Sequence, residues 1–190
     1  FARGLDHPRQ LLVLPNGDVL VAESNAQPKE ASGGLKGAAK RAAMKRAGAG
    51  VPSADRITLL RDGNGDGIAE TRTVFLDDLT SPYGMALVGD TLYIANTDAL
   101  VKFPYASGET AITAAPVEVA DLPAGPINHH WTKALAASRD GRTLYVGVGS
   151  NSNVAENGMD AEKDRAAVLA IDAGRGGVRA VASRLGTPSA

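Results

Sequence analysis

The strongest constraint on the fold is one pattern that occurs three times along the chain. The three copies are QLLVLPNGDVLVAES at residues 10–24, GMALVGDTLYIANT at residues 84–97 and KALAASRDGRTLYVGVGS at residues 133–150. Each copy has an apolar run, a turn in which Gly adjoins Asn or Asp, and a second apolar run. These turn residues supply the positive φ angles that tight hairpins need. The pattern therefore predicts three β-hairpins, which align on Leu20, Leu92 and Leu144.

Two further strands follow each hairpin. Their segments are DRITLLRD and ETRTVFLDDL after the first, ALVKFPYASG and PVEVADL after the second, and AAVLAIDAG and GVRAVASRL after the third. Four strands repeated about every 40–50 residues, once insertions are removed, are typical of β-propeller blades. We expect an all-β chain with about three four-stranded blades. A β-sandwich remains the alternative, because its strands need not repeat in register.

Three blades do not close a ring, since propellers have roughly four to eight. We therefore expect residues 1–190 to form a partial β-propeller domain. Its open strand edges would be covered by missing blades or by another chain. The chain begins FARGL without Met and ends RLGTPSA just after an expected strand, so we expect both ends to be cut ends.

Residues 26–54 do not fit the repeat, and we interpret them as an insertion. Residues 26–50 carry a net charge of +5, because six basic side chains face one acid, Glu30. The basic residues are Lys29, Lys36, Lys40, Arg41, Lys45 and Arg46. A weak apolar stripe predicts a short basic helix over about residues 34–47. This helix is either a solvated surface insertion or a docking element for an acidic partner or an anionic lipid surface.

The composition excludes several classes of protein. Apolar residues make up 44% and charged residues 22%, as in an ordinary soluble globular protein. The net charge of −1 argues against nucleic acid as a partner, and no apolar run approaches the roughly 18 residues of a membrane span. Cysteine is absent, which excludes disulfides, thiolate metal sites and cysteine nucleophiles.

One loop has half of a calcium-binding pattern. In DGNGDGIAE, Asp62, Asn64 and Asp66 alternate, and Gly67 follows at the sixth position, as in the first half of an EF-hand loop. The second half is missing, because Thr73 stands at the twelfth position and strands flank the loop. Alternating Gly and Asp equally suit a hairpin loop whose side chains bond the local backbone.

Two of the three histidines and the single tryptophan are adjacent, in GPINHHWTK at residues 125–133. Neighbouring side chains on an extended segment point to opposite faces, so His129 and His130 are not expected to bind one ion together. One imidazole is enough for general-base catalysis. The other interpretation is a packing corner, in which a histidine bonded to the backbone lies under Trp131.

Several segments together resemble a known family. LDHPRQLLVLPNGDVLVAE, SPYGMAL, MKRAGAGVPSADRITLLRDGNGDG and, above all, HWT…SRDG…LYVGVGSNSN are similar to the sorbosone dehydrogenase branch of the soluble quinoprotein sugar dehydrogenases. The resemblance covers almost the whole chain. It implies a six-bladed propeller that holds pyrroloquinoline quinone (PQQ) with calcium beside it. It also implies oxidation of a sugar hydroxyl or hydrated aldehyde, an electron acceptor such as a cytochrome or dye, and a periplasmic or secreted location.

The resemblance also implies roles for particular residues. His130 matches the base that takes the hydroxyl proton, and Asn151 falls where relatives have a polar side chain near the cofactor. His129 stands where some relatives have an aspartate. The family's Arg-Asn pair after the third blade is replaced by Gly186 and Thr187, with Arg184 two residues out of step. The carbonyl groups that hold the family's calcium would lie beyond the last residue.

These observations leave three functions open. The first is a PQQ-dependent dehydrogenase fragment with His130 as the base and Asn151 and Arg184 at the cofactor. The second is a non-catalytic propeller that binds a partner. The third is a metal-dependent, lactonase-type hydrolase, for which Glu23, Asn96 and Asn151 stand at comparable strand ends.

Overall fold

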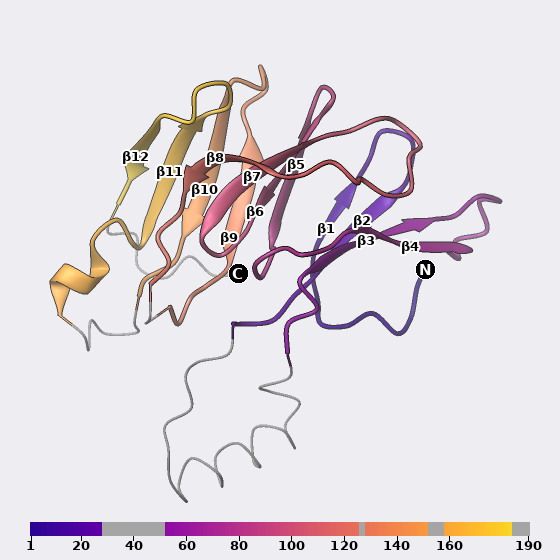
Figure 1. Cartoon of the computed structure of the whole chain (residues 1–190), viewed down its shortest axis with the longest axis horizontal. Helices are drawn as coiled ribbons and strands as arrows, with labels where there is room; N and C mark the ends of the chain where they lie inside the picture. Colours follow the sequence, from indigo (N-terminus) through magenta and orange to yellow (C-terminus); the bar gives the residue numbers. More distant parts are fainter. Residues whose placement is uncertain (28–51, 126–127, 152–157, 184–190) are drawn as a thin grey trace, which may run out of the picture.

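Three four-stranded antiparallel sheets make up the computed structural model, which describes residues 1–27, 52–125, 128–151 and 158–183 (Figure 1). The first blade contains β1 (Pro8–Val13), β2 (Val19–Glu23), β3 (Arg56–Arg61) and β4 (Thr71–Leu76). The second contains β5 (Gly84–Val88), β6 (Thr91–Ala95), β7 (Ala99–Pro104) and β8 (Val117–Asp121). The third contains β9 (Lys133–Ala137), β10 (Thr143–Val148), β11 (Ala167–Asp172) and β12 (Val178–Ala182).

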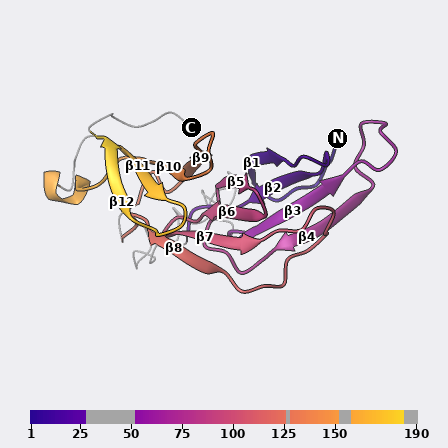
Figure 2. The same ribbon diagram turned by 90° about the horizontal axis from the view of Figure 1, so that it is seen from above.

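The strands of each blade are hydrogen-bonded in sequence order, and the blades lie side by side through their first strands. β5 contacts both β1 and β9, and the sheets fan out from this inner edge (Figure 2). The predicted propeller blades are thereby confirmed, and the β-sandwich alternative is wrong. A single 3₁₀ helix, η1 (Met159–Glu162), is the only helix within the described ranges. None of the chain that the structure describes forms a helix long and apolar enough to cross a membrane.

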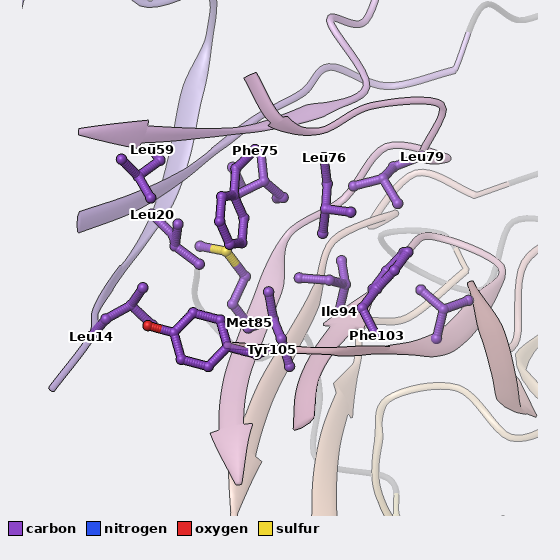
Figure 3. Close-up of a cluster of buried hydrophobic side chains, with 14 residues drawn as sticks. Leu14, Leu20, Leu59, Phe75, Leu76, Leu79, Met85, Ile94, Phe103 and Tyr105 are labelled. Atoms are coloured by element: carbon purple, nitrogen blue, oxygen red, sulfur yellow. The ribbon is translucent and has the colours of Figure 1, made fainter. Parts of the chain in front are cut away.

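Two apolar cores fill the spaces between the blades. The core between the first and second blades includes Leu20 and Ile57 on one side and Leu92 and Ile94 on the other (Figure 3). The core between the second and third blades includes Tyr93 and Leu144. Successive β6 residues thus enter opposite cores, because side chains alternate between the two faces of a strand.

The hairpin alignment made from the sequence is reproduced in the packing. Leu20, Leu92 and Leu144 are all fully buried, each on the second strand of its blade. The three expected turn glycines, Gly17, Gly89 and Gly141, have positive φ angles of 90°, 55° and 70°. The repeated pattern therefore encodes both the turns and the residues that pack between blades.

A buried ion pair joins the first hairpin to the next strand. The carboxylate of Asp18 accepts two hydrogen bonds of 2.7 Å from the Arg61 guanidinium, and Asp18 is only 2% exposed. These bonds hold the pKa of Asp18 below its ordinary value. Arg61 also donates to the Gly108 carbonyl at 3.0 Å, which ties the first blade to the loop between β7 and β8.

That loop covers part of the outer edge of the first blade. The Ile112 amide donates to the Phe75 carbonyl at 2.9 Å, and the Thr73 hydroxyl donates to the Thr110 carbonyl at 2.8 Å. Both bonds are made to residues of β4, whose outer side has no partner strand in the sheet. A covered edge is less open to pairing with another chain.

The expected basic helix over residues 34–47 lies outside the described residues. The ends of the insertion do come together, because the Asn25 amide donates to the Ser53 hydroxyl at 2.8 Å. Gln27 donates to the Ser81 hydroxyl at 2.9 Å, so the insertion starts beside the second blade.

Gly84 marks a tight contact between the first strands of two blades. A Cβ atom at this position would lie 2.5 Å from the Lys133 carbonyl oxygen and 2.6 Å from the Leu135 Cβ. We expect Gly84→Ala to lower the free energy of unfolding by roughly 1–3 kcal/mol, because overpacking here pushes against backbone atoms. Chemical denaturation measures the change. Gly177→Ala is the control, since a Cβ there meets nothing within 4 Å, and equal stability of the two variants would contradict the contact.

Candidate functional site

One end of the three blades gathers most of the residues that the sequence singled out. β1, β5 and β9 begin at this end and β2, β6 and β10 finish there, as the pairs Pro8↔Glu23, Gly84↔Ala95 and Lys133↔Val148 show. We call it the histidine end; it is at the bottom of Figure 1. Residues just before each first strand and just after each second strand therefore lie together.

His130 is half-buried at this end and has a defined orientation. Its Nδ1 lies 3.0 Å from the Ser150 carbonyl oxygen and 3.1 Å from the Ser150 hydroxyl oxygen. A carbonyl oxygen only accepts hydrogen bonds, so in the neutral imidazole Nδ1 carries the hydrogen and Nε2 keeps a lone pair. The side chain is therefore arranged to accept a proton at Nε2.

A glycine makes room for this histidine. A Cβ at Gly149 would lie 2.5 Å from the His130 Cβ. His129, by contrast, is exposed, and its backbone amide donates to the Asn151 carbonyl at 3.3 Å. The two adjacent histidines thus have different surroundings, and only His130 is oriented by a hydrogen bond that the structure gives to its ring.

Asn151 lies beside the histidines, after β10, and is 5% exposed. Its backbone amide donates to the Glu162 carboxylate at 2.7 Å, but its buried Oδ1 has no hydrogen-bond partner among the residues that the structure describes. Asn96, directly after β6, also has a buried Oδ1 without a partner in the described part of the chain. Such acceptors are costly to leave unbonded, so they favour a donor or a cation at this end. Arg184, the other expected cofactor residue, lies outside the described residues.

Two buried cationic side chains donate hydrogen bonds to the segment that carries His130. Lys133 is fully buried, and its Nζ donates to the Trp131 carbonyl at 3.1 Å. Arg165 is 5% exposed and donates to Asn128 Oδ1 at 2.7 Å and to the Ala124 carbonyl. Neither cation forms an ion pair within the described part of the chain.

The electrostatics of these cations reflect their burial. Burial, together with repulsion from Arg165, lowers the pKa of Lys133 to about 7, while Asp98 acts in the opposite direction. Burial also lowers the pKa of Arg165, with Glu162 opposing it. The sequence did not reveal either residue, because a lysine at the start of a strand and an arginine in a loop are normally exposed.

Trp131 packs across to the first blade. The Arg9 guanidinium lies 5.5 Å from the centroid of its ring, at cation–π distance. Arg9 also donates to the Ser24 carbonyl at 3.0 Å. Trp131 thus makes a packing contact, as the packing-corner interpretation expects, and the bond from His130 Nδ1 to the Ser150 carbonyl fits both that interpretation and a base.

Glu23 does not have the surroundings of an open metal ligand. It is fully buried and accepts hydrogen bonds from Arg56 at 3.0 and 3.2 Å, from the Thr58 hydroxyl and from the Asp6 amide. Burial alone would raise the pKa of Glu23, but the bonds from Arg56 and Thr58 outweigh it and hold the pKa below the ordinary value. This engagement argues against the lactonase-type hydrolase, which needs such carboxylates for its metal.

The acidic loop lies at the opposite end of the first blade, since β3 leaves the histidine end at Arg56. Ligand oxygens of Asp62, Asp66 and Glu70 lie within 4.8 Å of one another. The same side chains accept backbone amides of their own loop, for example Gly65 on Asp62 at 2.6 Å. The amides of Gly67 and Gly65 hold the pKa of Asp62 below its ordinary value. Local backbone bonding thus accounts for the alternating pattern, as the hairpin-loop interpretation expects, and calcium binding by this loop is the untested alternative.

The fold is similar to solved structures of sugar dehydrogenases. The PQQ domain of pyranose dehydrogenase from Coprinopsis cinerea is 18% identical, with a TM-score of 0.61 over 89% of this chain and 34% of that one. A calcium structure of a Trichoderma reesei carbohydrate-active enzyme of family AA12 is 19% identical, with a TM-score of 0.62 over 90% of this chain and 36% of that one. PQQ-bound aldose sugar dehydrogenase from Streptomyces coelicolor is 17% identical, with a TM-score of 0.56 over 90% of this chain and 46% of that one.

These likenesses establish the fold, and this chain spans between a third and a half of the length of those proteins. No curated protein matches the sequence. A family model described as a domain of unknown function, DUF7133, matches residues 3–184. The match covers nearly every residue of the three blades, and the chain therefore belongs to the DUF7133 family.

Proposed function

We propose that this domain is part of a PQQ-dependent dehydrogenase that oxidises a sugar or a sugar aldehyde of the sorbosone or aldose type. The observation that carries the proposal is the orientation of His130, whose Nδ1 is engaged by Ser150 and whose Nε2 is left to accept a proton. The similarity of the fold to PQQ-containing sugar dehydrogenases supports the same conclusion.

The residues at the histidine end fit part of a site for PQQ. The quinone is a tricarboxylate, and burying it needs positive charge nearby. Arg165, and Lys133 at a pH below about 7, supply positive potential there without an ion-pair partner among the described residues. The Asn151 Oδ1, which has no hydrogen-bond partner among the described residues, offers a polar contact. Arg184 is the further residue that we assign to the cofactor.

The chemistry divides between the cofactor and the chain. When bound, PQQ supplies the acceptor for the hydride that leaves the substrate carbon. His130 Nε2 takes the proton of the substrate hydroxyl, and the hydrogen bond from Nδ1 to the Ser150 carbonyl stabilises the imidazolium that results. Calcium, a cytochrome or dye as the electron acceptor, and a periplasmic or secreted location belong to the proposal through the family likeness alone.

A titration of the chain with PQQ tests the cofactor assignment. We expect saturable binding that is tighter with Ca²⁺ than without it, followed through the absorbance of the quinone. Raising the salt concentration weakens the binding, because the attraction between the cations and the carboxylates is screened. An absence of binding under all these conditions would favour the non-catalytic propeller that binds a partner.

Replacing His130 tests the base. In the full-length protein that contains this domain, we expect His130→Ala to reduce dye-linked oxidation of a sugar by about 10²–10⁴-fold, the usual contribution of a general base, while PQQ binding is retained. His129→Ala is the matched control, since His129 is adjacent but exposed, and it should keep turnover. Equal losses in the two variants, or unfolding of His130→Ala, would support the packing-corner interpretation instead.

A further inference from the structure

We infer that Lys133 and Arg165 are positioning residues, which hold the histidine segment so that His130 keeps its proton on Nδ1 and its lone pair on Nε2. The histidine segment is the described part of the connection between the second and third blades, Ala124–Gly125 and Asn128–Trp131. The inference rests on the proposed function only in giving His130 the role of base.

Three anchors fix the histidine segment, and a buried cation takes part in each. Arg165 donates to the Ala124 carbonyl and, at 2.7 Å, to Asn128 Oδ1. Lys133 donates to the Trp131 carbonyl at 3.1 Å. The anchors therefore lie at both ends and in the middle of the segment, and His130 is next to the last of them.

Thr97 connects the anchors to the second blade. Its hydroxyl accepts from Asn128 Nδ2 at 2.9 Å and donates to the Trp131 carbonyl at 3.1 Å. The Trp131 carbonyl thus accepts from Thr97 of one blade and Lys133 of the next. A continuous hydrogen-bond network runs from Lys133 through Trp131, Thr97 and Asn128 to Arg165. We therefore expect the loss of any one member to disturb the placement of His130.

Burying two cations to hold the histidine segment costs folding free energy, and this cost indicates that the placement of the segment matters for function. Neutral side chains of similar volume would avoid the desolvation of two positive charges that also repel each other, and such replacements are often neutral or stabilising. A cation, however, makes the stronger hydrogen bond to a carbonyl oxygen. The chain therefore has a lower folding stability but holds three oxygen atoms firmly beside the candidate base: the Ala124 and Trp131 carbonyl oxygens and the Asn128 Oδ1.

The charge of Lys133 changes in the neutral range. Arg165 and Asp98 are the charged groups that act on it, the first lowering and the second raising its pKa, which burial brings to about 7. In the unfolded chain the lysine has an ordinary pKa near 10.5, so between these values the unfolded state binds the proton and the folded state does not. The free energy of unfolding therefore rises as the pH increases from about 7 toward 10.5, because deprotonation of Lys133 removes the desolvation penalty of its buried charge.

Lys133→Met separates positioning from stability. At pH 6.5 we expect this variant to be at least as stable as the parent in chemical denaturation. Between pH 6.5 and 9 we expect the denaturation midpoint of the parent to rise relative to that of the variant. The ¹⁵N shifts of the His130 ring should show the Nδ1–H tautomer in the parent and a loss of at least half of it in the variant, toward the Nε2–H form that a free imidazole prefers.

The matched control is Lys163→Met, which removes an exposed lysine from the same blade and should change neither measurement. His130→Gln assigns the ring signals. An unchanged His130 tautomer in a folded Lys133→Met variant overturns the inference, whatever its stability. If Lys133→Met does not fold, Arg165→Lys gives the second test. It keeps the charge but replaces the two separate guanidinium nitrogens that bond Asn128 and Ala124 with a single nitrogen on a shorter side chain. Here too an unchanged tautomer is the contrary result.

The ¹⁵N measurement on the His130 ring needs neither quinone nor turnover. The proposed function and the positioning role can therefore be refuted independently of each other. A chain that binds no PQQ but whose His130 tautomer depends on Lys133 removes the proposed function and keeps the positioning role. A chain that binds PQQ and oxidises sugars with the His130 tautomer unchanged in both variants removes the positioning role alone.

Discussion

The burial of the second blade on both faces is the constraint on which the rest of the structure depends. Its strand β6 sends Leu92 and Ile94 into one core and Tyr93 and Ala95 into the other, so neither neighbouring blade can shift without opening apolar surface to water. The first strands then meet closely enough that only glycine fits at Gly84, against the backbone of β9. Because the blades are held in this order, the beginnings of their first strands and the ends of their second strands come together at one end.

Polar contacts at that end repeat from blade to blade. The Ser24 hydroxyl, after β2, donates to the Pro82 carbonyl ahead of β5 at 2.6 Å, and the Thr97 hydroxyl, after β6, donates to the Trp131 carbonyl ahead of β9 at 3.1 Å. Each blade thus fixes the segment that leads into the next one. The segment that leads into the third blade carries His130. The hydrogen bonds that hold neighbouring blades together therefore also orient the segment of the candidate base.

The fold could be predicted from the sequence because two signals coincide: turn glycines such as Gly17 and Gly141, and apolar runs centred on buried leucines. The location of His130 followed from the same repeat, since it precedes the first strand of a blade. The polar network could not be predicted, because it joins Thr97, Asn128 and Arg165, which come together only when the blades pack. Nor does the sequence reveal that the carboxylate of Glu23 is already engaged by Arg56, or that Lys133 is fully buried.

Comparison of two buried charged residues at the histidine end shows where the structure gives up stability. Glu23, at the end of β2, is buried with Arg56 and Thr58 bonded to its oxygens, so its charge favours the folded state and its pKa falls. Lys133, which pairs with the end of β10, is buried with a second cation, Arg165, acting on it, so its charge disfavours the folded state. The first arrangement is what packing alone selects. The second persists beside His130, where, under the proposed function, the position of a proton-accepting nitrogen matters more than the stability of one blade.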